Sequence, residues 1–138
     1  METTKTIANG ELNESSLRAK HRSTAEWLSA ISFWKKEMDF FQKLLDRYSG
    51  SFTSVGDKQK IDHFQNLIIF YNGELLETFK SKVRSHDKRL FNMVKKIEEL
   101  NREYEIEHQD LMEEMESVNK QIYSYHDELF GFIEKAIK

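Results

Sequence analysis

Histidines and carboxylates are the side chains in this sequence that could do chemistry. The 138 residues include five histidines and 24 acidic residues but no cysteine, so thiolate metal sites and thiol nucleophiles are excluded. Glu105-Ile-Glu-His108 has the Glu-x-x-His spacing of ferritin-like bundles, which need two such motifs and two further glutamates. Only one copy is present, so this motif does not indicate a di-iron centre.

Histidines from different helices give a second possible metal site. His21 and His86 both fall on apolar stripes, and the two turns described below would bring them level with Glu113 and its acidic neighbours. Two imidazoles and a carboxylate could hold a divalent ion such as zinc or iron. The commoner role of such histidines is a half-exposed hydrogen bond to a carboxylate. The sequence therefore predicts no metal and no cofactor, with His21, His86 and Glu113 as the alternative.

Catalysis is not indicated by any group of residues. Glu37 lies on an aromatic helix face, where a partly buried carboxylate can gain a raised pKa and act as an acid or base. More often the stem of such a glutamate packs on the rings while its head reaches solvent or a lysine. His126 is expected to form an interhelical ion pair with Glu74 or Glu77. No glycine-rich phosphate loop, nucleophile–base set or paired-carboxylate cleft is visible. We expect the protein not to be an enzyme.

The composition indicates an all-α protein. Charged residues make up 33% of the chain and hydrophobic residues 38%, there is no proline, and there are only five glycines. The net charge of −3 argues against nonspecific nucleic-acid binding. No apolar run approaches the roughly 20 residues that span a bilayer, and residues 1–10 lack the apolar core of a signal peptide. We expect a cytoplasmic protein with no membrane partner.

The first helix organises the rest of the chain. Residues 1–13 are polar and aperiodic and are expected to form a mobile tail. A helix is predicted from about residue 14 to residue 49. Aromatic residues recur along it every seven positions: Trp27, Trp34, Phe41 and Tyr48. Leucine, isoleucine and methionine run beside them, which makes the stripe too wide for one partner helix. The first helix therefore needs two partners.

Two further helices are expected, over about 57–99 and 102–137, after a Gly- and Ser-rich loop at 49–56. Apolar spacing alone would allow one continuous helix from Asp57 to Ile137. A basic block around residues 80–96 is followed, however, by an acidic block around 98–116. A turn at 97–104 would lay these blocks side by side, where their opposite charges attract. Two alternatives stay open: a break at Ser85-His86-Asp87, and an unbroken helix that dimerises.

The predicted fold is an elongated, up-down-up three-helix bundle with coiled-coil-like packing and one thick aromatic end. At the other end the hairpin is expected to project beyond the first helix as a two-helix tip. This tip carries five apolar residues: Val94, Ile97, Leu100, Tyr104 and Ile106. Uncovered apolar residues with a polar rim often mark interaction sites. We expect a partner protein or a second copy to dock there, unless residues 1–13 cover the tip.

Two segments carry a resemblance to known proteins. They are EWLSAISFWKKEMDFFQKLL at 26–45 and DHFQNLIIFYNGELLETFKSKVRSHDKRL at 62–90. The Trp-Leu-Ser step, the aromatic-x-x-Glu step and the His-Phe-Gln-Asn step resemble those of small all-helical proteins from Bacteroidetes-type bacteria, a functionally uncharacterised group. The resemblance implies a bacterial cytoplasmic origin and assigns no role to any residue.

The sequence as a whole favours a non-enzymatic helical bundle that acts by binding another protein or itself. Long heptad-like faces, polarised charge blocks and the lack of reactive groups all point in this direction. The alternative is a small metal-binding bundle that uses His21, His86 and a carboxylate of the third helix.

Overall fold

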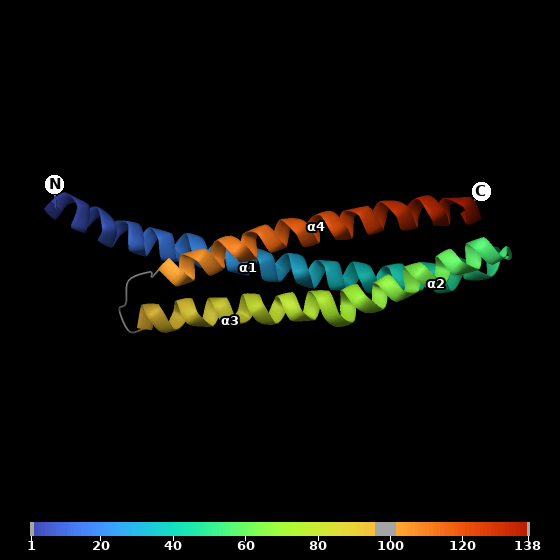
Figure 1. Cartoon of the computed structure of the whole chain (residues 1–138), viewed down its shortest axis with the longest axis horizontal. Helices are drawn as coiled ribbons and strands as arrows, with labels where there is room; N and C mark the ends of the chain where they lie inside the picture. The colour runs from blue at the N-terminus through green and yellow to red at the C-terminus, as the bar shows by residue number, and fades with distance from the viewer. Residues whose placement is uncertain (1, 96–101, 138) are drawn as a thin grey trace.

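The computed structural model describes residues 2–95 and 102–137, with side chains from Ser15 onwards, and this part of the chain is all-α. It forms an elongated up-down-up bundle (Figure 1). The helical elements are α1 (Glu2–Tyr48), the 3₁₀ turn η1 (Ser49–Ser51), α2 (Val55–Phe70), the π-helical turn η2 (Tyr71–Leu75), α3 (Leu76–Lys95) and α4 (Arg102–Ile137). Because α2, η2 and α3 follow one another without a gap, they form one continuous rod beside α1 and α4.

The loop after α1 lies where the sequence predicted it. Ser54 caps α2, since its hydroxyl accepts from the Asp57 backbone N–H at 3.1 Å, and α2 therefore begins two residues before the predicted start at 57. Phe52 is buried and stacks on Phe132 of α4 with ring centroids 4.3 Å apart. This contact fixes the loop to the C-terminal end of α4.

The N-terminal residues differ from their prediction. Residues 2–13 belong to α1 in the structure, although the sequence predicted that this helix begins at about residue 14, after a mobile tail. The segment has no proline, and Gly10 costs only about 1 kcal/mol in a helix, so nothing in it forbids helix. The helix α1 therefore begins beyond the far ends of α3 and α4 (Figure 1). The expected two-helix tip projecting past the first helix is wrong.

The main core lies at the aromatic end, as predicted. Phe41 is fully buried and its ring lies 5.7 Å from that of Tyr125, which in turn lies 5.8 Å from Phe64. The Tyr125 hydroxyl donates to the Phe64 backbone carbonyl at 2.9 Å, so this large buried ring leaves its polar atom satisfied. Each of the three helical rods contributes one ring to this contact.

The π-helical turn η2 marks a local widening of the rod. The Lys35 ammonium of α1 donates to the Asn72 carbonyl at 3.0 Å and pairs with Glu77 at 2.6 Å. Such turns leave a carbonyl without its usual helical partner. Lys35 supplies a partner from the neighbouring helix, which ties α1 to the middle of the rod.

The two alternatives for the second half of the chain are both wrong. The helix α3 runs through Ser85-His86-Asp87 without a break, and α3 and α4 pack side by side as a hairpin. Of the predicted turn at 97–104, residues 102–104 are already helical, and the rest lies outside the described residues. Lys82 pairs with Glu114 at 3.2 Å, so the basic and acidic blocks do meet.

The register of this hairpin differs from its prediction. The predicted turn at 97–104 was expected to place His86 level with Glu113 and its acidic neighbours, whereas His86 contacts Glu107. On α4, the observed partner Glu107 lies six residues before Glu113. Moving a turn by one residue shifts every pairing across an antiparallel hairpin by two, so a small error in the turn became a large one in the pairing.

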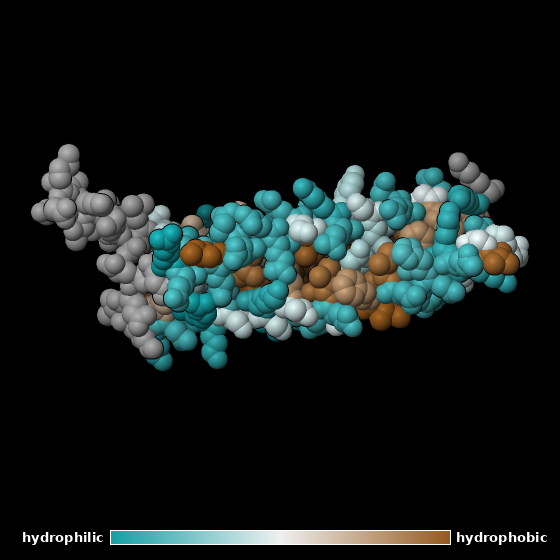
Figure 2. Space-filling view, viewed as in Figure 1, coloured by the Kyte–Doolittle hydropathy of each residue, from teal (hydrophilic) through white to brown (hydrophobic). Residues whose placement is uncertain are grey.

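A groove runs along the bundle between α4 and the rod of α2 and α3. Figure 2 shows hydrophobic side chains along it and hydrophilic ones on its rims. Beside α2 it is lined by Leu67, Tyr71 and Tyr125, with Lys120 and Glu128 at its edges. The helices α2 and α4 thus stand further apart than the other neighbours, and α1 packs against both.

Candidate functional site

The residues predicted as a metal site do not come together. His21 Nδ1 lies 2.9 Å from Asp87 of α3, whereas the neighbouring His86 on the same helix faces α4, where it contacts Glu107. Glu113 is exposed, and Gln109 of the same helix donates to it at 3.4 Å. Among the residues that the structure describes, no three histidines or carboxylates are placed to share an ion. The geometry therefore does not support the metal-binding alternative.

A different cluster joins α3 to α4, which we call the histidine layer: His86, His108 and Glu107. His86 Nε2 lies 2.8 Å from His108 Nδ1, and His86 Nδ1 lies 2.5 Å from a Glu107 oxygen. Arg89 donates to the other Glu107 oxygen at 2.7 Å. His86 is fully buried and His108 is 6% exposed. Polar groups buried this deeply must find their partners inside the protein.

The proton positions in the layer follow from the partners. The Glu107 carboxylate can only accept, so neutral His86 carries its hydrogen on Nδ1. His86 Nε2 is then an acceptor, and the hydrogen between the two rings belongs to His108 Nδ1. A second proton on His86 would face the hydrogen on His108 Nδ1 unless His108 carried its hydrogen on Nε2 instead. The pair is therefore arranged for two neutral imidazoles.

Burial favours this neutral state. It lowers the pKa of His86 against the opposing effect of the Glu107 carboxylate. It also lowers the pKa of His108 to about 4, and the neighbouring His86 and Lys20 act in the same direction. Both shifts have the sign expected of imidazoles withdrawn from water.

Aromatic rings enclose the layer on both sides. Tyr104 stacks on His86 with ring centroids 4.0 Å apart, and Trp27 of α1 lies 4.8 Å from His108. Below the layer lies the main core, and above it lies a small cluster of Leu90, Met93 and Tyr104. The histidine layer is thus a polar interruption between two apolar cores. Both rings are buried, and their hydrogen bonds link α3 to α4 while Trp27 of α1 packs on His108.

Glu37 and His126 form a second histidine–carboxylate pair at the aromatic end. The Glu37 carboxylate lies 3.4 Å from His126 Nδ1, so His126 meets a carboxylate of another helix as expected, but this carboxylate belongs to Glu37 and not to Glu74 or Glu77. Phe41 meets the His126 ring edge-on at 5.4 Å. Glu37 therefore has the ordinary role of such a glutamate, because its carboxylate contacts a partner at the edge of the core.

The predicted interaction tip is divided by the structure. Val94 and Ile106 are about half exposed, in agreement with the prediction, but Tyr104 is fully buried against His86. Ile97 and Leu100 lie outside the described residues. Of the three described residues of the predicted set, Val94 and Ile106 can therefore contribute to a surface and Tyr104 cannot.

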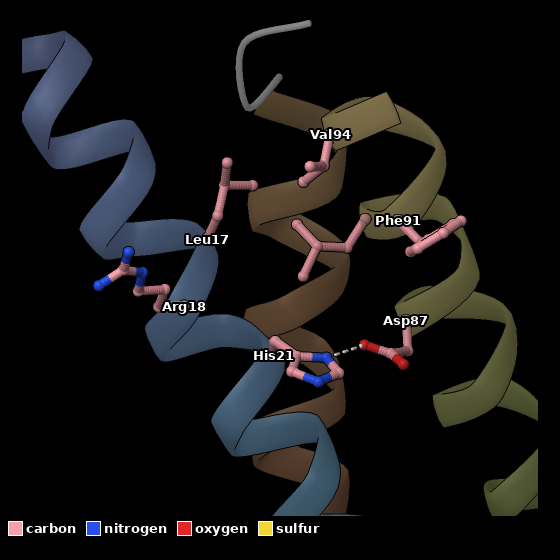
Figure 3. Close-up of a pocket in the computed structure, with 7 residues that line it drawn as sticks. Leu17, Arg18, His21, Asp87, Phe91 and Val94 are labelled. Carbon is pink, nitrogen blue, oxygen red and sulfur yellow. Dashed lines mark hydrogen bonds and ion pairs between the residues drawn. The ribbon is translucent and has the colours of Figure 1, made fainter. Parts of the chain in front are cut away.

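An apolar cup lies beside this tip, between α1 and α3, with a volume of about 340 Å³. Its lining residues are Leu17, Arg18, His21, Asp87, Leu90, Phe91 and Val94. Figure 3 shows α1 and α3 as its two walls, with α4 running behind them and the His21–Asp87 contact at its lower edge. Leu90 is buried, whereas Phe91 is 67% exposed. The floor is thus part of the small apolar cluster, and the rim is open.

Sequence reasoning found Val94 but missed the cup. Phe91 falls outside the apolar stripe of its helix, and Leu17 lies at the thin start of the first helix. The available signal was an aromatic residue off the stripe, directly after Leu90. It also missed Glu107 and His108, because the wrong hairpin register paired His86 with other carboxylates.

The fold and these sites define the class of protein: an all-α three-helix bundle with a buried polar layer and an open apolar cup. None of the described helices combines the length and the low polarity that crossing a membrane requires. No family model matches the chain, and comparison with curated proteins and with solved structures found no match either. The resemblance to Bacteroidetes-type helical proteins stays a prediction.

Proposed function

We propose that this protein is a non-enzymatic docking module that binds an acidic, amphipathic helix of a partner protein in the apolar cup. The observation that carries the proposal is the open rim of the cup, where Phe91 and Val94 stand exposed above buried Leu90. An exposed aromatic beside an apolar hollow is typical of the anchor sites of protein interfaces. An apolar face of a partner helix would fill the hollow and cover these side chains.

The charges around the cup favour an acidic partner. The helix α3 carries six lysines and arginines from Lys80 to Lys95 against Asp87, which is engaged by His21. Two of these cations, Lys82 and Arg89, already pair with carboxylates of α4. Lys88 and Lys95 are exposed and lie three and four residues from Phe91, on the same side of the helix. Arg18 lines the opposite wall on α1. Acidic residues flanking the apolar face of the partner would meet Lys88 and Lys95 on the α3 side.

The buried parts of the molecule favour binding over catalysis. The histidine layer lies beneath the cup, and its two rings are enclosed by Tyr104 and Trp27. These imidazoles have no open space in which to meet a substrate. They hold α3 and α4 in register, and this in turn positions the walls of the cup.

A titration with synthetic peptides tests the proposal. The probe is a helix-stabilised acidic peptide with leucines at i, i+3, i+4 and i+7, and the comparison is the same peptide with lysine in place of each acid. We expect saturable binding of the acidic peptide only. Phe91→Ser should weaken it by about tenfold or more, the range for loss of an interface anchor.

Ile69→Ser is the matched control, since Ile69 is similarly exposed but lies on α2, away from the cup. This variant should bind the acidic peptide like the wild type. Equal binding of the two peptides, or equal loss in the two variants, would contradict the proposal.

A further inference from the structure

A second exposed apolar surface lies on α1 and α4, on a different side of the bundle from the cup. We call it the aromatic face: exposed Phe33 and Phe40 of α1, exposed Tyr123 and Ile137 of α4, and half-buried Phe130 of α4 between the last two. Phe33 is 60% exposed and Tyr123 is 72% exposed. Rings of this size so fully open to solvent mark a contact surface more often than a solvated one.

The aromatic face consists of two straight rows. Phe33 and Phe40 are seven residues apart, and so are Tyr123, Phe130 and Ile137, which puts each set on one line along its helix. Because α1 and α4 run in the same direction, the rows lie side by side. The Glu37–His126 pair at 3.4 Å and the Phe41–Phe130 contact at 5.6 Å fix their relative height.

The charges beside the two rows are opposite in sign. The row on α1 is flanked by exposed cations: Lys36, Lys43 and Arg47. The row on α4 is flanked by exposed carboxylates: Glu116, Asp127 and Glu134. Given the register above, Lys36 lies near the height of Asp127, and Lys43 near that of Glu134. One face thus presents both halves of a complementary contact.

We infer that the aromatic face joins two copies of this chain in a two-fold symmetric dimer. An axis parallel to the helices places α1 of each copy on α4 of the other. Phe33 and Phe40 then pack against the row of Tyr123 and Phe130 in the partner, and each basic edge meets an acidic edge. The same patch serves on both copies, as closed two-fold symmetry requires.

The size of the face sets the strength of the dimer. Its length, from residue 33 to 47 of α1 and from 116 to 137 of α4, is about 30 Å at 1.5 Å per residue. With a width of two packed helices, about 20 Å, each copy covers about 600 Å², at the lower end for specific interfaces. The dimer is therefore expected to dissociate on dilution.

Sedimentation equilibrium over a range of concentrations tests this inference. The wild type should show a reversible monomer–dimer equilibrium. Phe33→Ser with Phe40→Ser should raise the dissociation constant by about tenfold or more, since both anchors of the basic row are lost. The control pair, Phe91→Ser with Val94→Ser in the cup, should leave it within about twofold. Circular dichroism should show the same helix content in all three proteins.

Exchanging the charges of two residues distinguishes this specific pairing from nonspecific association. Lys43→Glu should weaken the dimer because it places two acids together, and adding Glu134→Lys should restore it. A chain that stays monomeric at every concentration would overturn the inference. So would a dimer that survives loss of Phe33 and Phe40, or a charge exchange without recovery. Each of these results leaves the docking of an acidic helix in the cup intact, because the two surfaces share no residue.

Discussion

His86 Nε2 and His108 Nδ1 lie 2.8 Å apart, so two buried imidazoles share one hydrogen across the interface of α3 and α4. This contact can form in only one register of the hairpin, because the Glu107 carboxylate must also reach the far nitrogen of His86. An apolar pair in the same place would tolerate a slip more easily. The layer therefore stabilises one pairing against its neighbours, a recognised use of buried polar groups.

The histidine layer predicts a loss of stability in acid. The pKa of His108 is about 4 in the folded protein, against 6.5 for an ordinary histidine, so the unfolded chain binds a proton more readily. Stability is complete above pH 6.5 and falls as the pH drops towards 4, by about 3 kcal/mol from His108 alone. His86, whose pKa is also lowered, acts in the same direction. Urea unfolding at intervals between pH 7 and pH 4 measures this loss.

Two variants of the layer separate protonation from packing. His108→Gln keeps a polar side chain but cannot titrate, so its stability should depend less on pH over this range. Thr24→Val changes another buried polar residue of α1 that does not titrate, and should leave the slope unchanged. Parallel curves for the wild type and His108→Gln would show that His108 is not the group responsible.

Glu107 should matter more than the other glutamates of its helix. Glu107→Ala removes the acceptor of His86 and Arg89 together, and a buried donor left without its partner costs about 1–3 kcal/mol. Glu113→Ala is the matched control, since Glu113 is exposed on the same helix, and it should change stability by less than about 0.5 kcal/mol. Denaturant unfolding at pH 7 compares the two. Equal losses would show that the layer adds nothing beyond helix propensity.

The sequence predicted the three-helix bundle well because its signals were long. The seven-residue recurrence from Trp27 to Tyr48 and the opposite charge blocks extend over many turns of helix. Misjudging one residue therefore does not change the predicted fold. Both features reappear in the structure, as the buried aromatic core and as the Lys82–Glu114 pair. The absence of proline indicated the length of the helices, and it also permits α1 to start at Glu2.

The sites were harder to predict because they depend on register. Without a glycine or proline, the position of the turn can be predicted only to within a few residues. Moving the turn by one residue shifts the pairing across the hairpin by two. His86 was therefore assigned to the wrong carboxylates, and its contact with His108 was missed. Phe91 lies off the apolar stripe, and only the splayed arrangement of α1 and α3 turns it into the rim of a cup.

Adjacent phenylalanines on α1 offer a direct test of the aromatic core. Phe41 is 1% exposed and packs on Tyr125 and Phe130, whereas Phe40 is 52% exposed. Phe41→Ala should cost about 3–5 kcal/mol, the range for large aromatic truncations in cores, and Phe40→Ala less than about 1 kcal/mol. Unfolding should be measured on dilute protein, so that any self-association does not contribute. Similar losses for both would place the stripe at a surface.

Gly131 should be replaceable with a gain in stability. It lies inside α4, and a Cβ built there meets no atom within 4 Å. A glycine inside a helix often lets a neighbouring group pack closely against the backbone, but no described group packs closely against Gly131. Gly131→Ala should raise stability by about 0.5–1 kcal/mol, because alanine loses less backbone entropy in a helix. Thermal unfolding detects this as a higher midpoint. A lower midpoint would mean that a partner chain occupies the space beside Gly131.

The hairpin itself can be tested by distance measurements in solution. The sequence has no cysteine, so cysteines introduced at the exposed positions Arg84 and Asp110 can carry spin labels without further changes. Packed helix axes lie about 8–10 Å apart, and with the label arms the distance within one chain should be about 10–20 Å. An unbroken helix would separate the same positions by about 39 Å at 1.5 Å per residue. Diluting the labelled protein with unlabelled chain keeps the short distance if it arises within one molecule, and removes it if it arises between molecules. Loss of the short distance on dilution would mean that α3 and α4 pair between chains and not as a hairpin.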